Sequence, residues 1–107
     1  MKLTGKCKID FEKWQKAEDW FWNAEMFDAD YTNLELFNEL PNSLKYGVYV
    51  DYFDSVGIDI DVFNNRSQGF YGYRFTGMRY MKINIKTRQE ARTKAIEKAN
   101  EIYNEKL

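Results

Sequence analysis

Histidine is absent from this chain of 107 residues, and cysteine and proline each occur once. Without histidine the chain lacks the commonest general base and metal ligand, and catalytic triads built on an imidazole are excluded. The single cysteine, Cys7, cannot form an intrachain disulfide, which fits a reducing compartment. No apolar run reaches the roughly 18 residues of a membrane span, and charges interrupt the N-terminal segment, so we expect a cytoplasmic protein without a standard secretion signal.

Signatures of catalysis and of cofactor binding are also missing. Neither the phosphate-binding G-x-x-x-x-G-K-[ST] pattern nor the dinucleotide-binding G-x-G-x-x-G pattern occurs. Cys7 lies between Lys6 and Lys8, but it falls on an apolar stripe and no base accompanies it, so we interpret it as structural. Asp59 and Asp61 have a D-x-D spacing that a half-buried strand also produces. We therefore predict no metal, no cofactor and no enzymatic activity.

What the chain does contain is ample apolar material, 44% of its residues with 18% aromatic, which predicts one domain over 1–107. A helical periodicity predicts a first helix over 4–22. Its apolar stripe consists of Leu3, Cys7, Phe11, Trp14 and Phe21. Glu18 lies within that stripe, and we favour a frayed helix or an edge partner over an acid of raised pKa.

Two further helices are expected before residue 57. Thr32 and Glu35 form a capping box for a short helix that Pro41 ends. Ser43 is the expected cap of the next helix, Gly57 suits a left-handed residue after its end, and Gly47 inside it suggests close packing of another element. The apolar rhythm of that helix comes from Leu44, Val48, Tyr52, Phe53 and Val56.

After Gly57 the apolar period changes to two, which predicts strands. The segments IDIDVF, GFYGYRFT and RYMKINIK are separated by turns, and the third should place Met81, Ile83 and Ile85 inward. Thr87 and Glu90 form a capping box for a last helix with alanines on one face. The predicted fold is α+β: two or three N-terminal helices (1–57), a three-stranded antiparallel meander, and a C-terminal helix packed on the sheet (58–107).

Charge is sorted along the chain although the total is only -1. Residues 17–61 hold eleven carboxylates and one lysine, a net charge of -10, whereas residues 62–98 hold nine cations and two carboxylates, a net charge of +7. If the sheet order follows the chain order, the outward face runs from Asp59 and Asp61 past Arg74 to Lys82 and Lys86, so opposite charges can pair across the strands.

The basic half supplies candidates for contact with an anion or a nucleic acid. They are Lys82, Lys86, Arg88, Arg92, Lys94 and Lys98. On a helical wheel Arg88 and Arg92 fall within the apolar arc, so they must either overhang the sheet edge or fold back onto carboxylates of the acidic half. The surplus of carboxylates upstream favours folding back.

Residues 43–105 are similar in element order to a double-stranded RNA-binding domain, whose last helix opens with K-K-x-A-K. The matching positions here read R-Q-E-A-R, residues 88–92. The resemblance implies phosphate contacts by Arg88 and Arg92. The turn NNRSQG lacks the G-P-x-H loop of that family, and Asp51 and Asp54 occupy the helix that would contact RNA.

The segments LTGKCKIDFEKW, LPNSLKYGVYVDYFDSVGI and TRQEARTKAIEKANEIYN resemble small uncharacterised proteins of bacteriophages and integrated mobile elements. That resemblance implies an accessory role. The first hypothesis is a non-enzymatic protein that binds a protein partner through an acidic, aromatic helical surface. Its candidate residues are Trp20, Trp22, Phe27, Asp28, Asp30 and Tyr31. The alternative is a nucleic-acid-binding module that uses the basic start of the last helix, and self-association through a sheet edge fits either hypothesis.

Overall fold

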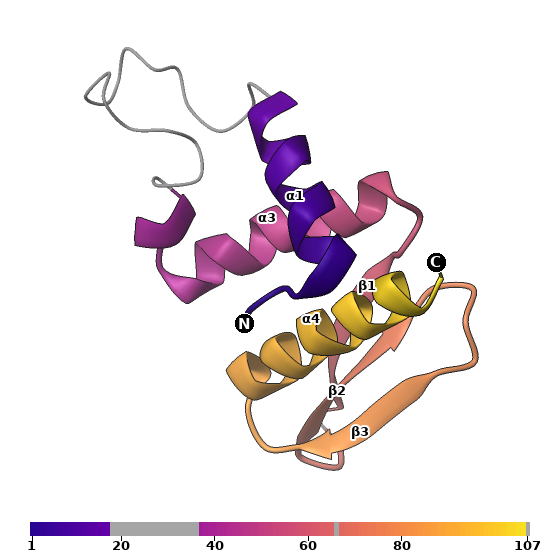
Figure 1. The fold of residues 1–107 in the computed structure, drawn as a ribbon. Helices are drawn as coiled ribbons and strands as arrows, with labels where there is room; N and C mark the ends of the chain where they lie inside the picture. Colours follow the sequence, from indigo (N-terminus) through magenta and orange to yellow (C-terminus); the bar gives the residue numbers. More distant parts are fainter. Residues whose placement is uncertain (18–36, 66, 107) are drawn as a thin grey trace.

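The computed structural model describes residues 1–17, 37–65 and 67–106 (Figure 1). Within these residues the chain has an α+β fold, as predicted. Three helices and three strands follow one another in the order α1 (Gly5–Ala17), α3 (Asn42–Ser55), β1 (Ile60–Asn65), β2 (Phe70–Phe75), β3 (Met81–Ile85) and α4 (Arg88–Glu105). Residues 37–39 are also helical.

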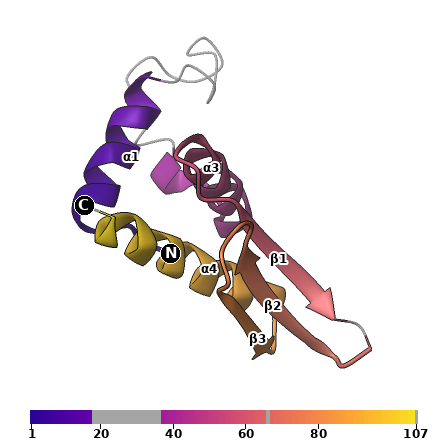
Figure 2. The same ribbon diagram turned by 90° about the vertical axis from the view of Figure 1, so that its right-hand side faces the viewer.

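The three strands form an antiparallel meander in the order β1-β2-β3, and α4 packs on one face of it (Figure 2). Paired residues share a face, so the buried pair Ile60 and Phe75 marks the face under the helix. Ala91, Ala95 and Ala99 of α4 are fully buried, because small side chains let the helix approach an aromatic-rich sheet closely. The predicted packing of the last helix is confirmed.

A cluster of aromatic rings joins α1 to α3. Phe11 of α1 contacts Tyr49 and Tyr52 of α3 with ring centroids 5.1 and 5.2 Å apart, and Phe37 also lies against Phe11. Cys7 is fully buried in the same core, which confirms its place on the apolar stripe. Edge and tilted ring contacts of this kind stabilise a core beyond the burial of their area.

The helix boundaries follow local chemistry, with two corrections. Thr87 caps α4 by accepting a hydrogen bond from the Glu90 amide at 3.1 Å, as predicted. Ser43 does not cap α3, because the helix begins at Asn42 with the extended Pro41 before it and no side-chain cap. Gly57 has the predicted positive φ of 83° after the end of α3. Gly47 does not mark close packing, since a Cβ there would meet nothing within 4 Å.

Strand β3 departs from the predicted alternation. Ile85 is buried, but Met81 and Ile83 are exposed at 57% and 39%, so two of the three expected inward positions are wrong. The pairing shifts by one residue between Tyr71↔Ile85 and Tyr73↔Lys82. This bulge exchanges the two faces of β3 at its middle, and its Asn84 has a left-handed φ of 67°.

Several predicted features fall outside the described residues. Helix α1 is described to Ala17, so the rest of the predicted helix over 4–22, with Glu18, is not described. The capping box of Thr32 and Glu35 is also outside. In α3, Val48, Tyr52 and Phe53 are buried as expected, whereas Leu44 and Val56 are exposed because they lie at the two ends of the helix.

Candidate anion-binding surface on strand β3 and helix α4

Four cations lie on β3, just after it, and in the first two turns of α4. Lys82 lies on β3, Lys86 follows it, and Arg88 and Arg92 are one turn apart at the start of α4. The Thr87 cap fixes this geometry, because it starts the helix at Arg88 and so places Arg92 on the same side. None of the four forms an ion pair with a described carboxylate. We call Lys82, Lys86, Arg88 and Arg92 the basic surface.

Tyrosine rings support the two arginines of the basic surface. The Arg88 guanidinium carbon lies 5.7 Å from the centre of the Tyr71 ring, and that of Arg92 lies 5.0 Å from the centre of the Tyr46 ring. A guanidinium over a ring is held in place without being neutralised. Both side chains therefore keep their charge and their hydrogen-bond donors for another contact.

The other two predicted anion contacts are arranged differently. Lys94 pairs with Glu90 at 3.3 Å and Lys98 pairs with Glu101 at 3.4 Å, both within α4. Lys98 also lies over the Tyr80 ring at 4.8 Å. A cation with a carboxylate one turn away adds little net positive charge at the surface. The structure thus divides the six predicted cations into four without ion pairs and two with local partners.

Two arrangements were expected for Arg92: overhanging the sheet edge, or folding back onto carboxylates of the acidic half. The structure shows a third. Arg92 rests on Tyr46 of α3 rather than on a described carboxylate. It also lines a hollow of about 330 Å³ whose other walls are Met1, Pro41, Asn42, Ser43 and Gln89. The first turn of α3 opens on this hollow without a side-chain cap and without an acidic residue. Unpaired amides of a first turn and a guanidinium both favour negative charge.

The described carboxylates upstream do not neutralise the basic surface. Asp61 pairs with Arg74 across the outward face of the sheet at 2.8 Å, a cross-strand pairing of the expected kind. Lys82, which was expected on the same face, is opposite Tyr73 of the buried face because of the bulge in β3. Asp51, Asp54 and Asp59 form no ion pair with a described cation. Burial first, and then the charges of Asp59 and Asp51, raise the pKa of the Asp54 carboxyl above its usual value. Among the described residues, Asp51, Asp54 and Asp59 are therefore not ion-pair partners of the basic surface.

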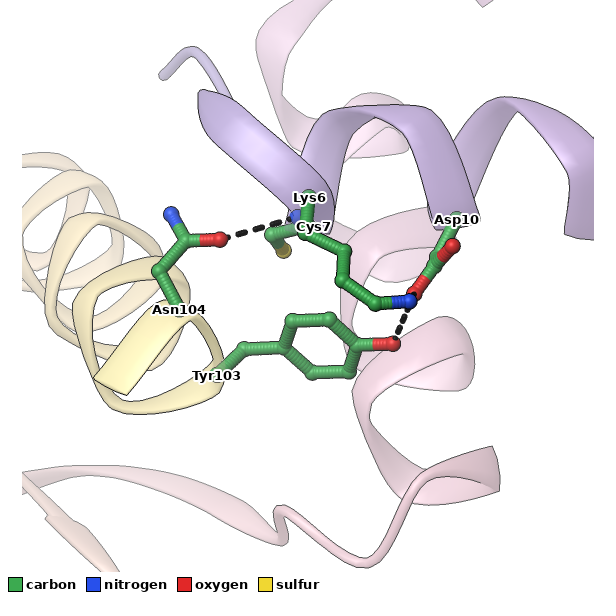
Figure 3. Close-up of polar contacts among 5 residues, drawn as sticks. All are labelled: Lys6, Cys7, Asp10, Tyr103 and Asn104. Carbon is green, nitrogen blue, oxygen red and sulfur yellow. Dashed lines mark hydrogen bonds and ion pairs between the residues drawn. The ribbon is translucent and has the colours of Figure 1, made fainter. Parts of the chain in front are cut away.

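A second polar cluster joins α1 to α4 (Figure 3). Asn104 accepts a hydrogen bond from the Cys7 amide at 2.9 Å, and the Tyr103 hydroxyl donates to Asp10, which also pairs with Lys6 at 3.1 Å. Tyr103 and then Lys6 hold the pKa of the Asp10 carboxyl below its usual value. These contacts fix one helix on another.

Cys7 is unsuited to nucleophilic chemistry at neutral pH. Burial raises the pKa of its thiol to about 12. The thiolate is the reactive form, and it is a negligible fraction of the thiol at neutral pH when the pKa is that high. This supports the structural interpretation of Cys7.

Comparison of the chain with protein-family models, with curated proteins and with solved structures finds no match. The assignment of a site therefore depends on the geometry of the chain itself. Sequence reasoning identified the cations but missed Tyr46 and Tyr71 beneath them, and also Gln89 beside Arg92. For Tyr71 a signal was available, since alternation along β2 places it on the face toward α4.

The candidate protein-binding residues all lie outside the described part of the chain. They are Trp20, Trp22, Phe27, Asp28, Asp30 and Tyr31. Within residues 1–17, 37–65 and 67–106, no three metal-binding side chains converge on one point. In the same residues no helix has the length and apolar character needed to cross a bilayer.

Proposed function

We propose that this chain is a non-enzymatic binding protein that holds a nucleic acid on its basic surface. The observation that carries the proposal is the absence of ion pairs to described carboxylates at Lys82, Lys86, Arg88 and Arg92, which lie on β3, just after it, and in the first two turns of α4. Phosphate binding is driven by such cations, and it does not require a basic protein as a whole.

The form of the basic surface favours a chain of phosphates over a single small anion. Lys82 and Lys86 are spaced along and just after a strand, and Arg88 and Arg92 lie on the following helix, so the four charges are spread over two elements. The rings of Tyr71 and Tyr46 lie against Arg88 and Arg92. Cations interleaved with aromatic rings are typical of surfaces that follow a nucleic-acid backbone.

Fluorescence anisotropy with labelled RNA and DNA oligonucleotides, measured over a range of salt concentrations, tests this function. We expect binding whose logarithm falls linearly with the logarithm of the salt concentration. Arg88→Ala should weaken binding and reduce that slope by about 1 if Arg88 contacts one phosphate. Lys94→Ala is the matched control, because Lys94 already has a carboxylate partner, and it should change little. The absence of any salt-dependent binding by the unmodified protein at low salt excludes the function.

Binding of a protein partner through an acidic surface is the second candidate. It is favoured by the cluster of Asp51, Asp54 and Asp59, in which burial and then the neighbouring charges raise the pKa of Asp54, and in which no described cation forms an ion pair. Repulsion of this kind is relieved when a basic partner docks. The accessory role in a phage or mobile element stays a prediction, and it is compatible with both functions.

The acidic candidate has a distinctive test. Asp54→Asn should raise the melting temperature, because it removes a repelled charge, and should weaken capture of a basic protein partner. Ser55→Ala, the adjacent position, serves as a control for nonspecific effects of substitution. If Asp54→Asn left partner capture unchanged at every salt concentration, the acidic cluster would have no part in binding.

A further inference from the structure

The sheet has a second face that no described helix covers. In Figure 2, α4 lies on one side of the strands and the other side is bare of described helices. Residues paired across the strands identify that side: Asp61 pairs with Arg74, Phe63 with Gly72, and Met81 with Arg74. None of these residues belongs to the buried core. We call Asp61, Phe63, Phe70, Arg74 and Met81 the open sheet face.

Two phenylalanine residues occupy neighbouring positions on the open sheet face. Phe63 is opposite Gly72, and Phe70 is two residues before Gly72 on the same strand, so the two side chains are diagonal neighbours. Both are half-buried. The Phe63 ring leans over Gly72, where a Cβ atom would come within 2.7 Å of it. The missing side chain at Gly72 thus leaves room for the ring to lie along the sheet.

Positive charge surrounds these rings. The Arg74 guanidinium lies over the Phe63 ring at 5.8 Å, and it shares its charge with Asp61. Arg79 just before β3 and Lys86 just after it are exposed and form no ion pair with a described carboxylate. Three cations therefore accompany two carboxylates, Asp61 and the exposed Asp59 just before β1, on and beside this face. Lys86 also belongs to the basic surface, so the two surfaces meet at the end of β3.

We infer that the open sheet face binds unpaired bases of a single-stranded nucleic acid, with Phe63 and Phe70 as stacking platforms. The inference rests on the proposed function and names the form of the nucleic acid and the surface that contacts its bases. Phosphates between the bases would reach Arg79 and Lys86, and the strand would continue past Lys86 onto Arg88. The excess of one positive charge and the two aromatic rings complement an anionic chain of flat bases.

Duplex RNA or DNA fits this face less well. Bases in a duplex are stacked on each other, and their faces cannot reach a ring on a flat sheet. In the double-stranded RNA-binding domains that residues 43–105 resemble, the helix corresponding to α3 contacts the duplex. Here α3 carries the exposed Asp51 and Asp54, which would repel phosphates. Single strands avoid both obstacles.

Competition experiments with defined oligonucleotides test the inference. We expect a labelled 12-nucleotide poly-U or oligo-dT probe to bind, and we expect an unlabelled single strand to displace it at a concentration at least about tenfold lower than a duplex of the same length. Phe63→Leu and Phe70→Leu should each weaken binding of the probe by about tenfold, the effect of losing one stacked base. Phe63→Tyr and Phe70→Tyr keep the ring and should bind like the unmodified protein. Circular dichroism melts check that each variant is folded.

The possible failures are distinguishable. If Arg88→Ala weakens binding but both leucine variants bind normally, the open sheet face is not the base-binding surface and only the inference is overturned. If duplex competes as well as single strand, the inference is overturned too. If no oligonucleotide binds the unmodified protein, both the inference and the proposed function are overturned. If Phe63→Leu changes the mass measured by light scattering and leaves probe binding unchanged, the face is an interface between copies of this chain, and the inference is again overturned.

Discussion

Arg92 shows what an arginine does when it lies beside an aromatic ring and not beside a carboxylate. An ion pair with the acidic half would make Arg92→Ala cost on the order of 1 to 3 kcal/mol. The contact with Tyr46 predicts a smaller loss in the free energy of unfolding, about 0.5 to 1 kcal/mol. Urea denaturation of Arg92→Ala measures the difference, and Lys94→Ala is the control on the same helix. A loss well above 1.5 kcal/mol would indicate a carboxylate partner after all.

Gly72 is a second position where one residue decides local structure. A Cβ there would lie 2.5 Å from the Lys82 carbonyl oxygen and 2.7 Å from the Phe63 ring. The carbonyl belongs to the strand backbone and cannot move aside without disturbing the bulge. We expect Gly72→Ala to reduce the free energy of unfolding by about 1 to 3 kcal/mol, as measured by thermal or chemical denaturation. Gly47→Ala is the control, since its Cβ would meet no atom within 4 Å and α3 should gain from it.

At the scale of elements, α1 receives its N-terminal cap from a distant part of the chain. Asn104 of α4 accepts from the Cys7 amide and donates to the Thr4 carbonyl, while Asn100 accepts from the Thr4 amide. Such caps satisfy amides that the helix itself leaves without partners. Losing one of them also loosens the contact between the first and last helices.

Removal of this cap has a measurable cost. Asn104→Ala should lower the free energy of unfolding by about 0.5 to 2 kcal/mol in urea denaturation. Asn104→Asp keeps the acceptor for the Cys7 amide and loses only the donor to Thr4, so its loss should be smaller. Equal losses for the two variants would show that the acceptor has no special role.

The sequence predicted the elements well where one local signal decides them. The Thr87 capping box, the left-handed Gly57 and the meander were each readable from a few adjacent residues. The bulge in β3 was not, because it depends on how Gly72 accommodates the Lys82 backbone across two strands. For the site, the cations were predictable from charge alone, whereas the tyrosines beneath them come from other elements and are set by tertiary packing.

At the scale of the whole molecule, the pKa of Asp10 is lowered and that of Asp54 is raised. The two carboxyls therefore make the free energy of unfolding depend on pH in opposite directions. Tyr103 and Lys6 lower the pKa of Asp10, so its contribution to stability is present above the unfolded pKa of about 4 and is lost as the pH falls through the folded value. Tyr103→Phe should therefore be less stable than the unmodified chain near neutral pH. Urea midpoints measured between about pH 3 and pH 7 should show the difference shrinking at the acidic end.

Asp54 behaves in the opposite sense. Its raised pKa means that the folded state holds the proton more tightly, so its stabilising contribution is complete below the unfolded pKa and is lost as the pH rises through the folded value. Asp54→Asn should be more stable than the unmodified chain near neutral pH, and the two should converge as the pH falls below about 4. A constant difference at every pH would show that the charge of Asp54 is not the cause.

Because Cys7 is the single cysteine of the chain and is fully buried, the rate at which its thiol is labelled reports how often α1 opens. A disulfide reagent in solution cannot reach a sulfur that is fully buried, so labelling waits until α1 separates from α4. The labelling rate at low reagent concentration then reports the equilibrium population of the opened form, and at high concentration it reports the opening rate itself. A single mass measurement over time would thus record how long this helix stays docked, with no engineered probe added.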